Sequence, residues 1–290
     1  MRVLFSYFAG GGGGLSNVKR LLREVASRRP DYEIVIVSKR IDDFDDLRDH
    51  ANIRLVAARS WLPGEFGRLW FGLFGLHEIA KRIGADLIWA MNLGVYRRAR
   101  IPQVLSINNA YQVYPLRVVR LHPAGVVSAV VLRFFSTLSI WASSAVFVQT
   151  NYMAGLTAVR VRRGTAVRVI SKSVDLPTSS QQSASLASLS TEARGLGSFA
   201  FAYVSTYFPH KNHAILVEAL ERIGAGGDGV RLVCTVSIED FPLEIRGRVE
   251  RLVEIGRLKL VGWVDAKDLP LIYESVDACV VPSVLESLSS

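Results

Sequence analysis

Short apolar runs that favour β-strands alternate with helix-like runs along nearly the whole chain, and no other feature constrains the fold as much. Most of these strand-like runs are apolar throughout, as in EIVIVS at residues 33–38. Such strands are buried on both faces, which favours a parallel sheet with helices on either side. In the first half, which is therefore predicted to be Rossmann-like, they occupy residues 2–8, 33–38, 52–57, 86–90, 103–107, 145–149 and 166–170.

Residues 176–198 interrupt this alternation. They are rich in Ser, Ala and Gln and offer little that could pack, so they are predicted to be an interdomain linker. The sequence then predicts an N-terminal Rossmann-like domain at 1–175 and a second, incomplete one at 199–290. In the second domain, strands are expected at 200–205, 230–237, 258–262 and 277–281, and helices at 212–223, 243–255 and 267–274.

The composition limits the class of protein. With 290 residues, 50% of them hydrophobic, the chain can bury a sizeable core. Its formal net charge of +9 favours an anionic ligand or an acidic membrane surface. Nucleic acid is not expected as a partner, because the chain has neither zinc-finger spacing nor a basic stretch interleaved with aromatics. The two cysteines, Cys234 and Cys279, lie in strand-like runs and are expected to be small core residues in a reducing compartment.

A run of glycines follows the first strand, in AGGGGG at residues 9–14. Ligands of open parallel sheets bind beyond the carboxyl ends of the strands, where glycines let the backbone approach a phosphate at the next helix. Gly12 and Gly13 are therefore candidate binding residues, with a plain flexible turn as the alternative. A dinucleotide fingerprint fits poorly, because the second strand ends in Lys39 and Arg40 rather than an acidic residue.

The loop after the first strand of the second domain carries a lysine at a predicted helix start. Pro209 and Asn212 are typical of such starts, and an apolar helical face follows them. Lys211 would thus add a full charge to the anion site that a helix N-terminus already provides. The alternative is a solvated surface lysine, and His210 and His213 are each more often structural than catalytic in such a place.

Two further loops follow strands, VGWV at 261–264 and PSVLESLSS at 282–290. Together with FPHKN and LPLIYESVDACVVPSVLES, they resemble the C-terminal signature of the retaining glycosyltransferases of family 4. VFVQTNYM and RVISKSVD in the first half agree more loosely. The resemblance implies the GT-B fold, in which two Rossmann-like domains face each other across a cleft, with the acceptor on the N-terminal side and the donor nucleotide on the C-terminal side.

The resemblance also implies roles for individual residues. Lys211 matches the lysine that holds the donor diphosphate, and residues 262–264 match the strand end whose backbone meets the nucleotide base. Glu286 matches the first glutamate of the E-x7-E motif beside the donor sugar, where a carboxylate favours an oxocarbenium-like transition state. No metal and no cofactor are expected, since lysine and helix dipoles can supply the countercharge. The donor-binding candidates are Gly12, Gly13, Lys211, Asn212, Trp263, Val264 and Ser283.

Three departures from the family pattern stand out. The arginine that accompanies the phosphate lysine would fall at Thr206, and a histidine on the acceptor side is replaced by Asn108, next to Asn109. An asparagine can hydrogen-bond but cannot act as a general base near neutral pH. The second glutamate of E-x7-E would lie beyond Ser290, so the chain is expected to be a C-terminally truncated fragment with little or no transferase activity.

Two segments suggest contact with a membrane. Residues 126–148 are almost all apolar or small, which is long enough for a membrane span. The arginine and serines within them favour a core helix followed by a strand, with a helix in the bilayer surface as the alternative. A second apolar patch is predicted near Arg68, formed by Trp61, Trp70, Phe71 and Phe74.

These observations predict a cytoplasmic glycosyltransferase of polysaccharide biosynthesis that can associate peripherally with the inner face of the membrane. Its substrates would be a nucleotide-sugar and a glycan or lipid-linked acceptor, and transfer would retain the anomeric configuration. Two alternatives remain open. One is an NADP-dependent oxidoreductase that binds the 2′-phosphate with Lys39 and Arg40. The other is a non-catalytic GT-B partner subunit, which the residues at Thr206 and Asn108 suggest.

Overall fold

The computed structural model describes residues 1–7, 13–58, 67, 70–95, 100–115, 125–170, 199–223, 229–265 and 268–285. The chain divides into two compact units, one from Met1 to Ser173 and the other from Val174 to Ser289. The predicted linker, 176–198, lies outside the described residues. Each unit is built on its own parallel sheet.

The first unit contains a seven-stranded sheet in the order β3-β2-β1-β4-β5-β6-β7, with every pair of neighbours parallel. Because all strands run the same way, their carboxyl ends share one edge. The order reverses between β1 and β4, which is where ligands of open α/β sheets bind. The strands are β1 (Arg2–Tyr7), β2 (Glu33–Ser38), β3 (Ile53–Ala57), β4 (Leu87–Met91), β5 (Gln103–Ile107), β6 (Ala145–Val148) and β7 (Ala166–Val169).

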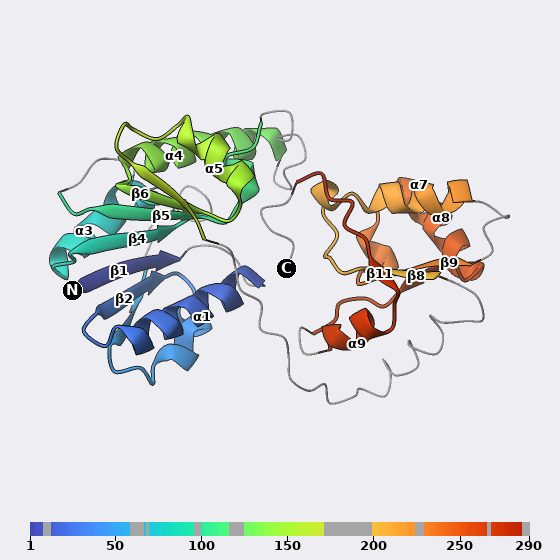
Figure 1. The fold of residues 1–290 in the computed structure, drawn as a ribbon, viewed down its shortest axis with the longest axis horizontal. Helices are drawn as coiled ribbons and strands as arrows, with labels where there is room; N and C mark the ends of the chain where they lie inside the picture. Colours follow the sequence, from blue (N-terminus) through green and yellow to red (C-terminus); the bar gives the residue numbers. More distant parts are fainter. Residues whose placement is uncertain are drawn as a thin grey trace. The chain divides into compact units, whose positions relative to one another are not determined.

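Helices cover both faces of this sheet (Figure 1). Helix α1 (Gly13–Arg28) and the 3-10 helix η1 (Ile41–Leu47) pack on one face, and α3 (Leu76–Arg82), α4 (Gly125–Ala142) and α5 (Asn151–Ala158) pack on the other. Two shorter helices complete the unit, the π-helix η2 (Phe71–Gly75) and the 3-10 helix η3 (Ala110–Gln112). This is the arrangement that the uniformly apolar strands predict.

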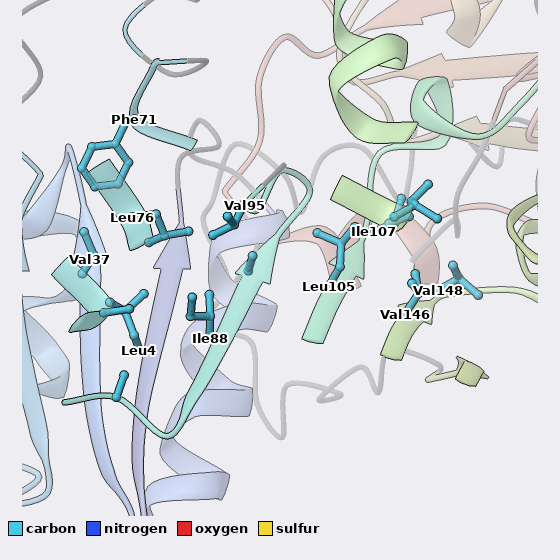
Figure 2. Packing of buried hydrophobic residues seen from close by; sticks show 14 of the residues in the cluster. Leu4, Val37, Phe71, Leu76, Ile88, Val95, Leu105, Ile107, Val146 and Val148 are labelled. Carbon is cyan, nitrogen blue, oxygen red and sulfur yellow. The ribbon is translucent and has the colours of Figure 1, made fainter. Parts of the chain in front are cut away.

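The core of the first unit lies between the sheet and the α3–α4–α5 face. Figure 2 shows side chains from five strands and from η2 and α3 meeting in one cluster, with Leu4, Ile88 and Leu105 fully buried. A fully buried leucine or isoleucine contributes about 1.5–3 kcal/mol through removal from water. A second cluster, around Phe5 and Leu22, fills the space under α1.

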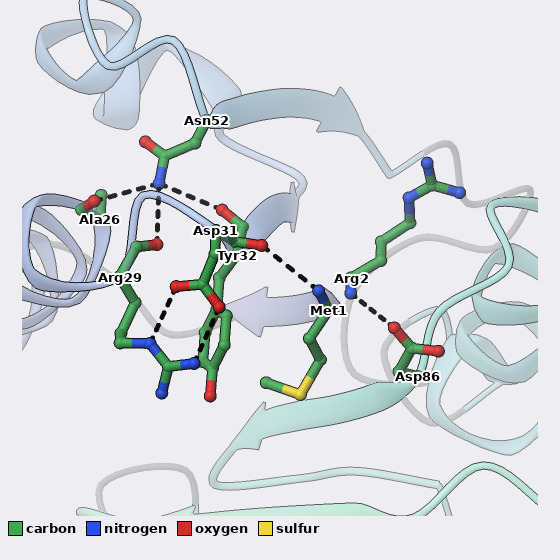
Figure 3. Close-up of polar contacts among 8 residues, drawn as sticks. All are labelled: Met1, Arg2, Ala26, Arg29, Asp31, Tyr32, Asn52 and Asp86. Atoms are coloured by element: carbon green, nitrogen blue, oxygen red, sulfur yellow. Dashed lines mark hydrogen bonds and ion pairs between the residues drawn. The ribbon is translucent and has the colours of Figure 1, made fainter.

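Polar contacts tie the amino ends of the strands to the helices around them (Figure 3). The side-chain amide of Asn52 donates to three backbone carbonyls at 3.1–3.3 Å, and the backbone N–H of Arg2 donates to Asp86 Oδ2 at 2.7 Å. The three carbonyls belong to Ala26, Arg29 and Tyr32. These contacts lie at the edge of the sheet opposite the carboxyl ends, so they stabilise the unit away from those ends.

The second unit has a four-stranded parallel sheet in the order β10-β9-β8-β11. Helices α7 and α8 pack through Val217, Leu220, Val249 and Leu252 into one cluster with β8, β9 and β10, and α9 lies on the other face (Figure 1). The strands are β8 (Phe199–Tyr203), β9 (Val230–Cys234), β10 (Leu258–Leu260) and β11 (Ala278–Cys279). The helices are α7 (His213–Ile223), α8 (Leu243–Glu254) and α9 (Leu269–Glu274), with 3-10 helices η5 (Pro209–Lys211) and η6 (Ile238–Asp240).

The sequence expectations need two corrections. Cys279 is exposed, whereas Cys234 is in the core as expected; both are free thiols. Residues 126–148 form a helix and a strand as predicted, but α4 is not a core helix, since its described buried residues are only Ala129, Ser136, Ser139 and Ile140.

Candidate functional site

Two loops of the second unit are joined through Tyr203, the last residue of β8. Its hydroxyl donates to the backbone carbonyl of Lys211 at 2.8 Å and lies 2.9 Å from Ser283 Oγ. A tyrosine hydroxyl has one proton, so Ser283 must be the donor in the second bond. Tyr203 is 2% exposed, and its position is therefore fixed by packing. It holds the lysine turn and the loop after β11 in one place.

Asn212 strengthens the same connection. Its backbone is left-handed, with φ 57°, a conformation that asparagine tolerates better than most residues. Its side-chain amide donates to the carbonyl of Pro282 at 3.2 Å, and the N–H of Val284 donates to the carbonyl of His210 at 2.8 Å. The residues that sequence analysis assigned to one donor site, Lys211, Asn212 and Ser283, are thus brought together by the fold.

Lys211 is the last residue of the 3-10 turn η5, and Asn212 separates it from helix α7, so it lies at the helix N-terminus as expected. The N–H of Ile215 in the first turn donates to the carbonyl of Asn212 at 3.2 Å, and the helix dipole adds a partial positive charge at this end. The side chain of Lys211 is half-buried. This end of the second unit is therefore suited to an anion.

His213, the first residue of α7, is a structural residue. It is 2% exposed, and its ring packs between Tyr203 and Tyr207, with centroid distances of 4.7 and 5.1 Å. Burial, helped by the charge of Lys211, lowers its pKa to about 4. The imidazole is thus neutral at pH 7 and adds no charge to the anion site.

The third predicted loop follows β10. Gly262 has φ 69°, which favours glycine, and a Cβ there would lie 3.3 Å from Ser237 Oγ. Trp263 is 73% exposed, and Val264 is half-buried. The hydrogen bonds that join Tyr203, Lys211, Asn212 and the Ser283 loop do not include Trp263. The structure therefore brings this loop to the same sheet edge but not into the cluster around Tyr203.

A cavity of about 1010 Å³ lies along strand β10 and helix α8. Ser237 and Gly262 line one part of it, whereas Lys211 and Ser283 do not line it. Its other walls come from the body of the edge strand and the helix rather than from the carboxyl ends of the strands. We therefore place the candidate site at the Tyr203 cluster, where the chemistry of the side chains fits, and not in this cavity.

In the first unit, side-chain amides gather at the carboxyl ends of β4, β5 and β6. Asn92 Oδ1 accepts from the backbone N–H groups of Asn108, at 2.8 Å, and Asn109, at 3.1 Å. Gln149 Nε2 donates to Asn108 Oδ1 at 2.9 Å, and Gln112 Nε2 donates to the carbonyl of Asn92 at 2.6 Å. We call these five residues the amide cluster. It contains no ionisable side chain.

Within the described residues, two groups of the amide cluster lack a hydrogen-bond partner. The side-chain oxygens of Gln112 and Gln149 are buried without a hydrogen bond, and the two residues are 0% and 3% exposed. A buried acceptor left unpaired costs about 1–3 kcal/mol. Asn109, by contrast, uses its side-chain oxygen locally, accepting from Tyr111 N at 3.0 Å at the start of η3. Because both oxygens are buried, only a small donor such as an internal water could reach them.

Two predicted site residues, Gly12 and Glu286, lie outside the described residues. Gly13 is the first residue of α1, at the carboxyl end of β1. Sequence analysis missed Tyr203, Asn92 and Gln112. A polar residue directly after an apolar strand, as in Ala-Met-Asn at 90–92, was the available signal for Asn92. In the described part of the chain, no group of three or more His, Cys, Asp or Glu could hold a metal ion.

Two parallel α/β units, with polar loops at the carboxyl ends of both sheets, define the GT-B class of fold. HepE from Anabaena, solved with UDP and glucose, is similar over 100% of this chain and 76% of its own, with TM-score 0.62 and 18% identity. Sucrose-phosphate synthase from Thermosynechococcus elongatus covers 99% and 77%, with TM-score 0.65 and 15% identity. A glycosyltransferase from Rickettsia africae covers 97% and 73%, with TM-score 0.57 and 16% identity.

These structural neighbours are GT-B glycosyltransferases, and the fold predicted from the sequence is confirmed as two parallel-sheet α/β regions of this type. No family model matches the chain, and the search of curated proteins found no match. At these identities the likeness establishes the fold, and the reaction must be argued from the site.

Proposed function

We propose that the protein is a glycosyltransferase that takes its sugar from a nucleoside-diphosphate sugar, as a member of glycosyltransferase family 4. The observation that carries the proposal is the junction at Tyr203, which holds Lys211 and the Ser283 loop together at the start of α7. The GT-B fold, and a neighbour solved with UDP and glucose, support it. The nucleotide diphosphate would bind at this junction.

The chemistry follows from the charges. Breaking the bond between sugar and phosphate leaves negative charge on the departing diphosphate, and a fixed cation at a helix N-terminus stabilises that charge. Lys211 and α7 would supply both. Thr206 provides no second cation, so Lys211 is expected to carry a large share of the phosphate affinity.

We further propose that transfer retains the anomeric configuration, with Glu286 beside the donor sugar. A carboxylate there would favour the positive charge that develops on the sugar ring. Trp263 and Val264 would lie beside the nucleotide base. These roles rest on the resemblance of VGWV and PSVLES to the family signature, and Gly12 and Gly13 in the glycine run are proposed as further donor-binding residues.

The amide cluster is our proposed acceptor site. Its members are neutral, and Asn92, Asn108 and Asn109 are only half-buried, which suits a substrate with several hydroxyl groups such as a glycan or the sugar of a lipid-linked acceptor. Asn108 cannot take a proton from the acceptor near neutral pH, so proton removal would have to fall to another group, such as the departing phosphate.

The two alternatives differ in support. Arg40 is paired with Asp43 at 3.0 Å, and the structural neighbours do not favour an NADP-dependent oxidoreductase. A non-catalytic GT-B partner subunit still has Thr206 and Asn108 in its favour. Such a subunit would be expected to bind a nucleoside diphosphate weakly or not at all.

The test is calorimetric titration of the chain with UDP, and with NADPH for comparison. Lys211→Ala should weaken UDP binding by about 1–3 kcal/mol, the range for losing a charge-assisted hydrogen bond. Arg222→Ala is the matched control, because it removes the same charge from the far end of α7, where Arg222 pairs with Glu218. Equal UDP affinity in wild type and Lys211→Ala would exclude the junction as the phosphate site. NADPH binding in preference to UDP would favour the oxidoreductase.

A further inference from the structure

One face of helix α4 is apolar and exposed. Val127 is 78% exposed and Phe134 is 59% exposed, and the other exposed residues of this face lie one or two turns from them. The face is formed by Val126, Val127, Val130, Val131, Phe134 and Trp141, which we call the α4 stripe. Single exposed apolar residues need no explanation, but a continuous stripe on one helix marks an interaction surface.

The opposite face of α4 is fastened to the sheet by polar contacts. Ser139 Oγ accepts from the N–H of Gly94 at 3.2 Å, and the side chain of Gln103 on β5 donates to Ser143 Oγ, just past the helix, at 2.9 Å. Both serines are buried. Helix α4 therefore cannot turn its stripe inward.

Helix α4 is also the one described helix that is long and apolar enough to cross a membrane. It has 18 residues, of which 22% are buried. Its serine contacts hold it as one layer of the first unit, and a span would break them. The stripe is therefore suited to lying in a membrane surface rather than to crossing the membrane.

The positive charge of the protein is concentrated in the stretch of sequence that contains this helix. Residues 87–174 contain eleven Arg and Lys and no Asp or Glu. The rest of the chain has 24 basic and 26 acidic residues, so the whole net charge of +9 originates in the segment that contains α4. Basic residues near a membrane contribute roughly 1 kcal/mol each to attraction by anionic lipid.

Several of these arginines lie beside α4. Arg133, on the helix, donates to the carbonyl of Tyr114, and Arg160 donates to the carbonyls of Gln112 and Val113, both at 2.8 Å. Burial and the nearby Arg133 lower the pKa of Arg160 to about 10. Among the described residues, no carboxylate pairs with either guanidinium. The positive charge beside the stripe is therefore not neutralised.

Aromatic residues extend the surface. The guanidinium of Arg162 lies over the ring of Trp141 at 5.0 Å. Trp70 and Phe74 pack against each other at 4.6 Å and are each about half exposed, and η2 covers the same sheet face as α4. Of the predicted second patch, Phe71 is buried rather than exposed, and Trp61 and Arg68 lie outside the described residues.

We propose that the α4 stripe inserts into the surface of an anionic lipid bilayer, with the surrounding arginines against the lipid phosphates. Apolar side chains with tryptophan and a basic border match the interfacial region of a membrane, where the apolar part is buried and the cations meet anionic headgroups. A second copy of the chain fits less well, because a two-fold contact through this stripe would place two positively charged regions face to face.

The experiment is co-sedimentation of the protein with vesicles, without nucleotide, so its outcome is independent of the proposed transferase activity. The wild type should bind phosphatidylglycerol–phosphatidylcholine vesicles at low salt, and bind pure phosphatidylcholine vesicles far less. High salt should release it. The variant Val127→Ser with Phe134→Ser should bind at least about tenfold more weakly, since losing burial of one such side chain already costs this much.

The matched control is Leu243→Ser with Ile255→Ser, two exposed apolar residues of the second unit at 77% and 60% exposure. It should bind vesicles like the wild type. All variants replace exposed side chains, and circular dichroism checks that they are folded. The proposal is overturned if the wild type stays in solution with anionic vesicles, or if the α4 variant binds as tightly as the control. It is also overturned if light scattering shows that the wild type is a dimer and the α4 variant a monomer, while the two bind vesicles equally.

Discussion

Asn92 is the residue at which the geometry of the amide cluster can be tested most directly. It has φ 64°, in the left-handed region, and its side-chain oxygen accepts from two consecutive backbone N–H groups. Its backbone N–H donates to the carbonyl of Ser106, and its backbone carbonyl accepts from Gln112 Nε2; any substitution other than proline leaves both bonds available. Substitutions at Asn92 can therefore test its two structural roles separately: the left-handed backbone angle and the side-chain hydrogen-bond acceptor.

Three variants give different losses. Asn92→Asp keeps an acceptor oxygen and tolerates the left-handed backbone, so its stability should stay close to that of the wild type. Asn92→Gly keeps the backbone angle but loses both hydrogen bonds, which costs about 0.5–1.5 kcal/mol of stability for each bond. It loses about 0.4–1 kcal/mol more, because glycine gives the unfolded chain more conformational freedom. Asn92→Ala loses the same bonds and carries about 1–2 kcal/mol of left-handed strain.

The expected order of stability is thus wild type and Asn92→Asp, then Asn92→Gly, then Asn92→Ala. The losses are about 1.4–4 kcal/mol for the glycine variant and about 1 kcal/mol more for alanine. Urea unfolding followed by tryptophan fluorescence is a suitable assay. Four of the five tryptophans, Trp61, Trp70, Trp89 and Trp141, precede residue 173, so the signal reports mainly on the first unit.

Two results would refute this reasoning. If Asn92→Gly were as stable as the wild type, the hydrogen bonds to Asn108 and Asn109 would not hold the loop. If Asn92→Ala were as stable as Asn92→Gly or more so, the left-handed backbone at this position would be wrong. A loss in Asn92→Asp as large as in Asn92→Ala would contradict the acceptor role as well.

Two predictions concern the second unit. Gly262→Ala should destabilise this unit by about 1–2 kcal/mol, because φ is 69° and the new Cβ would meet Ser237 Oγ. Gly247→Ala, inside helix α8 where nothing lies near the new Cβ, should stabilise the unit by about 0.5–1 kcal/mol. Thermal unfolding of both variants tests the two expectations, and equal shifts in unfolding temperature would contradict them. The pKa of His213 is lower in the folded state than its ordinary 6.5, so the unfolded state binds the extra proton and stability should fall by about 3 kcal/mol as pH drops from 6.5 to about 4. In His213→Phe this part of the loss should be absent from the pH dependence of urea unfolding, and an unchanged pH profile would show that His213 is not buried as a neutral ring.

The strands could be predicted because each is apolar along its length. EIVIVS at 33–38 is β2 and QVLSI at 103–107 is β5, residue for residue. The ends of other strands were predicted too long, as at 230–237, where β9 stops at Cys234. There the apolar pattern continues in Val236, which is buried but makes no strand pairing. A run of apolar residues indicates which residues are buried. Where a strand ends depends on its hydrogen bonds to neighbouring strands, which the local sequence does not contain.

The site was predictable only where its residues follow a strand. Lys211 and Ser283 each stand in a loop at a carboxyl end, and the fold brings those ends together. Asn212 was expected to start a helix. Its left-handed backbone instead lets the side chain reach the carbonyl of Pro282, 70 residues away. Tyr203 reads as one more apolar strand residue, and only the structure shows that its hydroxyl joins the two loops.

The proposed phosphate site and the proposed membrane surface lie on units of opposite net charge. The unit from Met1 to Ser173 has 25 basic and 11 acidic residues, whereas residues 174–289 have 10 basic and 15 acidic ones. A diphosphate that binds near Lys211 therefore approaches a unit of net negative charge, so its affinity must come from short-range contacts with the ammonium group and the start of α7. The α4 stripe lies on a unit whose basic residues outnumber its acidic ones, 25 to 11, and the attraction of such a charge to anionic lipid acts over a Debye length. The phosphate site thus depends on geometry fixed by Tyr203, and the membrane surface depends on the sum of many arginines that need no fixed positions.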